Sequence, residues 1–490
     1  MRSADPPDLS ASANSSVSAN APAAANAPTA GSSAARAWVV GIVGAGTMGA
    51  GIAQLALEGG SRVLLYDVDP AAVGRATARI MAGLLHRASK RTSTEPTEPT
   101  EPTPTRRAAA EPTKSRQPNA AREWVATTIA RLESAPDLDV LARASDIVIE
   151  AALEEVGAKQ AIFARLDAMA PPGAILATNT SALSVGQIAF ATNRPERVLG
   201  LHFFNPAPIM RLVEVVAAPD TAPGHIDLAM DLVRSWGRTP VRCADTPGFI
   251  VNRVNRPFTL EALRILAAGG GTIEGIDAAL RADGFPMGPF ELMDLVGIDV
   301  NLAAARGIYE KFGRTARFRP SPIQERLVTA GQLGRKSGQG FYRYDLDGRA
   351  LGPAAEVLGA APVPALAIES SAVEPQHAAH ATDVADVAPL APLAPLAPMT
   401  PGEIVDWVVL AIVNEAYRAL GEHVALQDDI DLALRLGAGH PRGPFEQVDR
   451  FGGLAGVVAR LEALVPAGDA RFEPAALLRE RAIAQLASAP

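Results

Sequence analysis

The chain has 490 residues, of which 48% are hydrophobic and 20% charged, and this predicts two or three domains with buried cores. Its formal net charge of -8 gives no electrostatic reason to expect nucleic acid or an anionic membrane surface as a partner. The single cysteine, Cys243, excludes an internal disulfide and favours a reducing, cytoplasmic location. No uninterrupted apolar run is long enough to predict a membrane span.

Residues 1–35 are mainly Ala, Ser, Asn and Pro. Such a segment cannot bury enough apolar surface to offset the entropy of ordering it, so we predict a disordered tail. It also lacks the apolar centre of a secretory signal.

Three glycines, Gly44, Gly46 and Gly49, stand between an apolar run at 38–43 and a helical pattern, and the next apolar run ends in Asp67. This order is typical of a dinucleotide-binding unit, because the glycines let a pyrophosphate approach the helix N-terminus and the acid accepts hydrogen bonds from a ribose 2′-hydroxyl. A 2′-phosphate would meet the charge of Asp67, and no Arg follows it. The motif therefore predicts NAD rather than NADP.

Glu-Pro-Thr repeats occur within residues 94–102, a composition that neither helix nor sheet accepts. We therefore predict a disordered insertion over 91–119, between helices at 71–90 and 121–134.

Strand and helix patterns alternate over the rest of 36–245 and predict a Rossmann-type, doubly wound α/β domain with a parallel sheet. Ligands of such sheets bind at the carboxyl ends of the strands. Four polar residues fall at those ends: Glu150, Asn179, Ser181 and His202.

One possible general base, His202, is followed by the carboxylate Glu214, and Pro206 and Pro208 break the chain between their two apolar runs. Adjacent strands joined by such a break would bring the two side chains together. A histidine held by a carboxylate has a fixed tautomer and a free nitrogen that can accept a substrate proton. The same pairing also occurs as a purely structural contact.

From residue 246 the helical pattern dominates, and 249–268 is predicted as one long helix that is kinked at Pro257. Residues 345–400 are rich in Ala and Pro, which predicts an extended linker.

Beyond that linker the helical pattern returns, since 404–420 resembles 250–266 and a second Gly-Pro-Phe-Glu motif follows. We therefore predict two copies of an all-α module, at 246–344 and 401–490. Asp406 stands where the first copy has Asn252, so the second copy is expected to serve packing rather than chemistry.

Three motifs carry a family resemblance: His202-Phe203-Phe204-Asn205-Pro206, Asn179-Thr180-Ser181 and Thr246-Pro247-Gly248-Phe249-Ile250-Val251-Asn252-Arg253. Through them the chain resembles the 3-hydroxyacyl-CoA dehydrogenase family over 38–344, apart from the insertion, and again over 403–490. Three further stretches look most similar to the phenylacetate-pathway 3-hydroxyadipyl-CoA dehydrogenases: Ser235-Trp236-Gly237, Val241-Arg242-Cys243 and Gly334-Arg335-Lys336-Ser337-Gly338. The resemblance implies NAD-dependent oxidation of a (3S)-3-hydroxyacyl-CoA thioester, in β-oxidation or in phenylacetate degradation.

The resemblance also implies roles for individual residues. His202 would be the base and Glu214 its orienting partner, and three neutral groups would hold the substrate oxygens: Ser181, Asn205 and Asn252. Cofactor contacts would come from Glu154, Lys159 and Asn179, beside the glycines and Asp67. No metal is implied.

Two basic residues are candidates for substrate binding. Lys90 would meet the CoA moiety, although the predicted insertion starts directly after it and a solvated lysine is the alternative. Arg256 lies four residues after Asn252 on the predicted helix, so it could meet a distal carboxylate, together with Arg253. A solvated arginine, or one paired with Glu261, is the alternative.

Other functions remain open from the sequence. The substrate could be 3-hydroxybutyryl-CoA or a general fatty 3-hydroxyacyl-CoA. A dehydrogenase of free β-hydroxy acids would be expected to use a lysine rather than His202, and a non-catalytic NAD-binding relative would not be expected to retain the complete set of polar residues. The helical modules could pair within a monomer or join a homo-oligomer.

Overall fold

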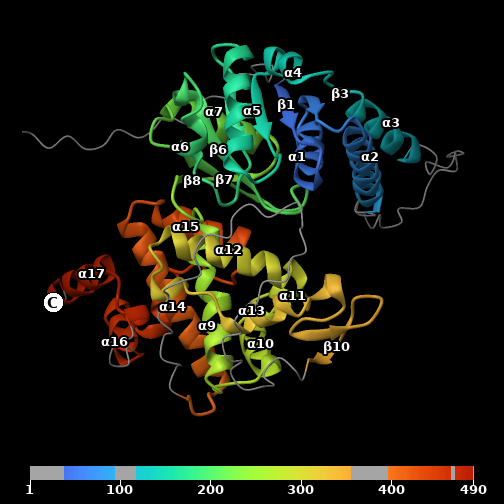
Figure 1. Ribbon diagram of the computed structural model, residues 1–490. Helices are drawn as coiled ribbons and strands as arrows, with labels where there is room; N and C mark the ends of the chain where they lie inside the picture. The colour runs from blue at the N-terminus through green and yellow to red at the C-terminus, as the bar shows by residue number, and fades with distance from the viewer. Residues whose placement is uncertain (1–37, 94–116, 355–394, 465–469, 489–490) are drawn as a thin grey trace, which may run out of the picture. The chain divides into compact units, whose positions relative to one another are not determined.

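The computed structural model describes residues 38–93, 117–354, 395–464 and 470–488 (Figure 1). The predicted tail (1–35), most of the predicted insertion (91–119) and most of the predicted linker (345–400) lie outside the described residues.

An eight-stranded sheet forms the centre of the first domain, in the order β3-β2-β1-β4-β5-β6-β7-β8. All neighbouring strands are parallel except β6 and β7, which are antiparallel. The strands are β1 (Val39–Val43), β2 (Arg62–Tyr66), β3 (Leu132–Ser134), β4 (Ile147–Glu150), β5 (Ile175–Thr178), β6 (Val198–Phe203), β7 (Leu212–Ala217) and β8 (Thr239–Ala244). The central strands are buried and almost wholly apolar because helices cover both faces. The predicted doubly wound sheet is confirmed.

Two groups of helices cover the sheet. One face packs against α1 (Thr47–Glu58), α2 (Pro70–Ser93), α3 (Gln117–Ile129) and α7 (Pro223–Ser235). The other packs against α4 (Leu138–Ala144), α5 (Val156–Met169) and α6 (Val185–Ala189). The predicted helix over 121–134 is wrong at its end, because Leu132–Ser134 forms the edge strand β3 beside β2. A three-residue strand with one apolar side chain leaves almost no pattern in a sequence.

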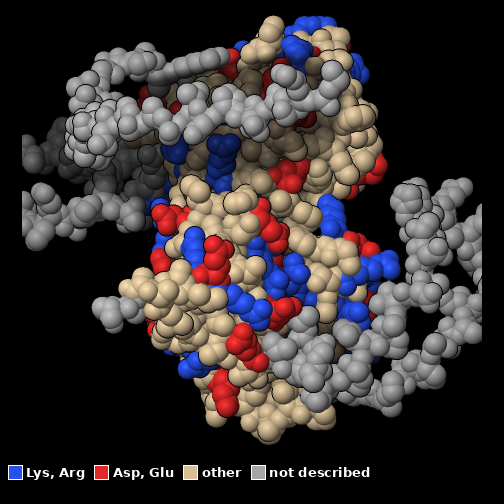
Figure 2. Space-filling view, turned by 90° about the vertical axis from the view of Figure 1, so that its left-hand side faces the viewer, with Lys and Arg blue, Asp and Glu red and all other residues tan. Residues whose placement is uncertain are grey.

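The first helical module contains α8 (Val251–Val254), α9 (Arg256–Ala267), α10 (Ile273–Ala282), α11 (Pro289–Val296), α12 (Ile298–Lys311), η3 (Ala316–Phe318) and α13 (Pro322–Thr329). The second contains α14 (Pro401–Gly421), α15 (Gln427–Gly437), α16 (Leu454–Leu464), η7 (Ala470–Phe472) and α17 (Ala476–Ala487). No described helix is long and apolar enough to cross a membrane. On the face drawn in Figure 2, acidic and basic side chains are interspersed over the helical part rather than gathered by sign.

The start of the predicted linker is structured. The strand β10 (Ala350–Pro353) pairs antiparallel with β9 (Tyr342–Tyr344), so these residues form a hairpin. At the other end, the N–H groups of Leu396 and Met399 donate to carbonyls that follow α9. The predicted linker is therefore wrong at its start, whereas residues 395–400 are extended and connect to the segment after α9.

The predicted continuous helix over 249–268 is also wrong, because it divides at Asn255 into α8 and α9. Pro257 lies in the first turn of α9, where its missing N–H does no harm, whereas inside a helix its ring would clash with the preceding turn. At the matching position of the second module stands Ala411, and α14 runs unbroken.

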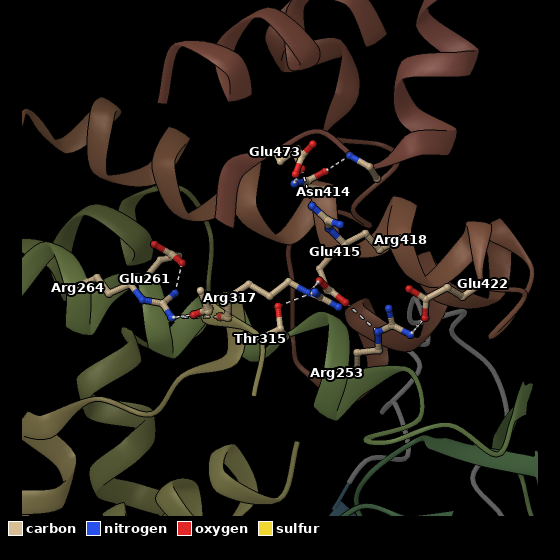
Figure 3. A network of polar contacts seen from close by, with 12 residues as sticks. Arg253, Glu261, Arg264, Thr315, Arg317, Asn414, Glu415, Arg418, Glu422 and Glu473 are labelled. Atoms are coloured by element: carbon tan, nitrogen blue, oxygen red, sulfur yellow. Dashed lines mark hydrogen bonds and ion pairs between the residues drawn. The ribbon is translucent and has the colours of Figure 1, made fainter. Parts of the chain in front are cut away.

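The two modules pair with each other inside the chain through α9 and α14. Matching residues make reciprocal contacts. Arg317 of η3 donates to Glu415 of α14 at 2.8 Å (Figure 3). In the same way, Arg471 of η7 lies 3.5 Å from Glu261 of α9. Such exchange of equivalent contacts is the signature of a twofold interface. The second module thus takes the place that a second subunit would occupy in a symmetric dimer.

Candidate active site

The antiparallel pair β6 and β7 brings His202 and Glu214 directly opposite each other. His202 Nδ1 lies 2.6 Å from Glu214 Oε2, and the residues are 6% and 0% exposed. An ionised carboxylate only accepts hydrogen bonds, so the contact assigns the proton to Nδ1 and leaves Nε2 with a free lone pair. The predicted juxtaposition of the two residues is confirmed.

The second oxygen of Glu214 holds the start of α8. Oε1 accepts the backbone N–H groups of Ile250 and Val251 at 3.0 and 2.8 Å. The chain reaches this point through a turn in which Gly248 has φ +78° and Phe249 φ +48°. One buried carboxylate therefore fixes both the histidine and the helix that carries Asn252.

Asn252 and Ser181 are neighbours as well. Asn252 Nδ2 lies 3.5 Å from the Ser181 carbonyl oxygen, so the polar end of β5 meets α8. Two neutral groups that can donate hydrogen bonds thus come together beside the residues held by Glu214.

Two more predicted residues lie on the strand ends around His202. Asn179 Oδ1 accepts the N–H of Phe203 at 2.9 Å, which ties the end of β5 to the end of β6. Asn205 is exposed in the loop that follows β6.

The rings of Phe204 and Phe249, which sequence reasoning did not single out, flank His202 at centroid distances of 4.5 and 5.8 Å. Their apolar faces limit the access of water to the imidazole. Both phenylalanines lie inside the quoted motifs, so the signal was present but had no assigned role.

The turn between β1 and α1 fits a dinucleotide. Gly44 has φ +100°, and a Cβ there would lie 2.6 Å from the Ala151 carbonyl oxygen. Gly46, the N-cap of α1, is different: apart from its own chain neighbours, no described residue lies within 4 Å of a Cβ placed on it, and no described side chain caps the helix. Open backbone N–H groups at a helix N-terminus are suited to a pyrophosphate. Asp67, after β2, accepts the N–H of Ala45 at 2.7 Å and so lies against the same turn.

Beside this turn lies a partly buried ionic network that includes two predicted cofactor contacts, the buried Lys159 and the exposed Glu154. Lys159, 1% exposed, donates to Glu150 Oε1 at 2.6 Å and lies 3.3 Å from Glu154. Glu154 in turn accepts the hydroxyl of Thr180 and the N–H of Ser181. Lys159 therefore joins Glu150, at the end of β4, to Glu154, and Glu154 reaches Ser181.

Arg256 is neither solvated nor paired with Glu261. It is 6% exposed, and its Nε has no hydrogen-bond partner among the described residues. Burial lowers the pKa of the Arg256 guanidinium to about 10. Glu261 instead contacts Arg264 and accepts the indole N–H of Trp407 at 2.9 Å. Because the chain divides at Asn255, Arg256 does not share one continuous helix with Asn252.

Two other basic residues, Arg253 and Lys90, also lie in surroundings that differ from those predicted. Arg253 was expected to assist Arg256, but its buried guanidinium is held by Glu415 and Glu422 of the second module at 2.8 and 2.7 Å. Lys90 is exposed on α2, which continues to Ser93, so the insertion does not start directly after it. Arg87, one turn earlier, donates to the Pro208 carbonyl in the loop after His202.

Comparison with known proteins agrees with this geometry. The family model "3-hydroxyacyl-CoA dehydrogenase, NAD binding domain" matches residues 39–246, and "3-hydroxyacyl-CoA dehydrogenase, C-terminal domain" matches 248–344 and again 402–488. The chain is 37% identical to the 3-hydroxyadipyl-CoA dehydrogenase of Escherichia coli, over 91% of this chain and 97% of that protein. It is 39% identical to the mitochondrial hydroxyacyl-coenzyme A dehydrogenase of Rattus norvegicus, over 62% of this chain and 90% of that protein.

Among solved structures, the crystal structure of 3-hydroxybutyryl-CoA dehydrogenase from Escherichia coli superposes with a TM-score of 0.71 at 34% identity. The match covers 93% of this chain and 100% of that one, so both helical modules have counterparts there. From its NAD-binding domain through both C-terminal modules, the chain belongs to the 3-hydroxyacyl-CoA dehydrogenase family.

Proposed function

We propose that this NAD-dependent dehydrogenase oxidises (3S)-3-hydroxyadipyl-CoA to the 3-oxo thioester, with His202 as base and Glu214 as its orienting partner. The observation that carries the reaction type is the buried His202–Glu214 contact of 2.6 Å beside Asn252 and the glycine turn. Similarity to the Escherichia coli 3-hydroxyadipyl-CoA dehydrogenase along nearly the whole chain supports the acyl group.

The proton of the C3 hydroxyl is the part of the reaction that the chain handles itself. Nε2 of His202 accepts it, and the positive charge that develops on the ring is stabilised by Glu214 Oε2. NAD, when bound, supplies the acceptor for the hydride that leaves C3. The glycine turn at Gly46 would hold its pyrophosphate and Asp67 its ribose.

Neutral donors suit the oxygen at C3, which gains negative charge as the proton leaves. The hydroxyl of Ser181 and the amides of Asn205 and Asn252 can donate to it without placing a fixed charge beside His202. Lys90, on the same helix as Arg87, is proposed to meet the CoA moiety.

The distal end of the acyl group is assigned to Arg256. Arg256 is buried, and desolvation lowers its pKa with no carboxylate of the described residues to offset the effect. An anion that reached the guanidinium would therefore stabilise its charged form. The distal carboxylate of an adipyl chain is such an anion, whereas a butyryl chain ends in a methyl group.

The test compares two substrates, with NADH absorbance as the readout. The wild-type chain should turn over 3-hydroxyadipyl-CoA and 3-hydroxybutyryl-CoA, with the higher kcat/KM for the first. Arg256→Leu should lower kcat/KM for the adipyl substrate about 10- to 150-fold, because a charge-assisted pair contributes roughly 1.5–3 kcal/mol. The butyryl substrate should change little and serves as the matched control.

The competing assignments have their own outcomes in the same assay. Equal losses on both substrates would assign Arg256 to the fold, and a wild-type preference for 3-hydroxybutyryl-CoA would favour the activity after which the similar Escherichia coli crystal structure is named. A chain that binds NAD without turnover would be the non-catalytic relative. We also propose a cytoplasmic monomer, since the second module already covers the pairing surface of the first.

A further inference from the structure

The short helix α8 is attached both to the sheet and to the second helical module. At its start, Glu214 accepts the N–H groups of Ile250 and Val251. Toward its end, Arg253 extends into the second helical module, where Nε donates to Glu415 at 2.8 Å and Nη1 to Glu422 at 2.7 Å (Figure 3). Asn252 lies between these two attachments. A four-residue helix has little stability of its own, so its position depends on both.

Arg253 itself is buried in this attachment. Arg253 is 0% exposed and its guanidinium lies 4.7 Å from the centroid of the Phe312 ring. Burial alone would lower the pKa of Arg253, but the carboxylates of Glu415 and Glu422 outweigh that effect and raise the pKa. The guanidinium therefore remains charged and bound to the second module.

A second contact joins the same module to the same place. At the end of α15, a Cβ on Gly437 would lie 2.6 Å from Leu212 and 2.9 Å from Val251. Leu212 begins β7, the strand of Glu214, and Val251 begins α8. The glycine thus allows α15 to pack directly against the elements that carry the site.

The two copies differ at the decisive position. Trp407 matches Arg253 in the repeat and donates its indole N–H to Glu261 at 2.9 Å. Each of these two positions therefore contacts the matching glutamate of the other module, Glu261 for Trp407 and Glu415 for Arg253. Arg253 also binds a second carboxylate, Glu422, and so forms an ionic clamp beside Asn252.

We propose that the second helical module, which contributes no group to the reaction, positions Asn252 for the substrate through the clamp of Arg253 on Glu415 and Glu422. This inference rests on the proposed role of Asn252 at the substrate oxygen. It makes Arg253, Glu415 and Glu422 positioning residues, which act on turnover through α8. A helix that is displaced by a fraction of an ångström still folds but holds the oxygen less well.

Glu422→Gln is the informative variant, because the Glu422 side chain is half exposed whereas Glu415 is buried and holds two arginines. We expect a roughly 3- to 30-fold lower kcat with unchanged NAD affinity, in the range found for residues that couple without touching a ligand. Glu422→Asp, which keeps the charge, should recover most of kcat. The matched control is Asp283→Asn, which breaks another ion pair between the modules, with Arg450 at 2.6 Å, and should leave kcat unchanged.

A double-mutant cycle separates positioning from general stability. In an Asn252→Ala background, Glu422→Gln should have no further effect on kcat, because the group through which it acts is gone. Multiplied losses in the double variant, or a Glu422→Gln enzyme with wild-type kcat, would overturn the inference. An inactive wild-type chain would instead refute the proposed function on which the inference rests.

Discussion

Replacing Glu214 by Gln tests the site through its tautomer. The carboxylate accepts three hydrogen bonds, one from His202 Nδ1 and two from the N–H groups of Ile250 and Val251. A glutamine has one carbonyl oxygen and one NH₂ group for the same two positions. If the NH₂ group faced Ile250 and Val251, two buried donors would be unsatisfied at about 1–3 kcal/mol each.

The carbonyl oxygen of the glutamine should therefore face the two N–H groups, and its NH₂ group should donate to His202 Nδ1. The imidazole proton then moves to Nε2, so the nitrogen that faces the substrate can no longer accept a proton. We expect kcat to fall by about two to four orders of magnitude, the full contribution of a positioned base. That loss corresponds to roughly 3–5 kcal/mol of transition-state free energy.

The assay is NADH formation from 3-hydroxyadipyl-CoA, together with NAD affinity and the midpoint of thermal unfolding. Affinity and midpoint should stay close to wild type, because all three hydrogen bonds persist. Without the N–H groups of Ile250 and Val251, the glutamine could turn its carbonyl oxygen toward His202 and preserve the tautomer, and the loss of kcat would be milder. A Glu214→Gln enzyme that keeps more than about a tenth of wild-type kcat would refute the tautomer argument.

Two further predictions concern the cofactor turn and the interface between the modules. Gly46→Val should weaken NAD binding at least about tenfold, because the added side chain occupies space that the pyrophosphate needs. Its thermal midpoint should fall only modestly, by the cost of a poorer N-cap. Gly44→Ala, at φ +100°, should lower the thermal midpoint further, because its Cβ would meet the Ala151 carbonyl. His440, packed against Phe285 with its pKa lowered by burial to about 3, binds a proton more readily unfolded than folded. Stability that is present above the unfolded pKa of 6.5 should therefore decline as the pH falls toward 3. Between pH 7 and pH 5, the free energy of unfolding should fall by roughly 2 kcal/mol because of this histidine. Urea unfolding curves of His440→Phe at the two pH values should lack this part of the decrease. An equal pH slope in wild type and the His440 variant would contradict the assignment.

The elements that could be predicted from the sequence are those determined by residues that lie close together in the chain. The strand β1 lies within the predicted apolar run at 38–43, and β2 ends one residue before Asp67 as expected, since apolar periodicity and end residues act within a few positions. His202 and Glu214 are only 12 residues apart, and a proline-broken return between adjacent strands was enough to bring them together.

The features that the sequence left out depend on contacts between distant residues. Arg253 meets Glu415 across 162 positions, and Trp407 meets Glu261 across 146. No periodicity encodes such pairs, so Arg253 was considered for the substrate and Glu261 for Arg256. The division of the helix at Asn255 was missed for a different reason, because a proline permits either a kink or a new first turn. At the division, Asn255 Oδ1 lies 2.7 Å from His440 Nε2 of the second module, a contact that no local pattern shows.

His202 Nε2 is proposed as the proton acceptor in an NAD-dependent oxidation. The most direct test of this role is the turnover of 3-hydroxyadipyl-CoA by wild type and His202→Gln, with NAD affinity measured in parallel. We expect NADH formation by wild type, a loss of about two to four orders of magnitude in kcat for the variant, and unchanged NAD binding. Turnover by His202→Gln at the wild-type rate would contradict this role.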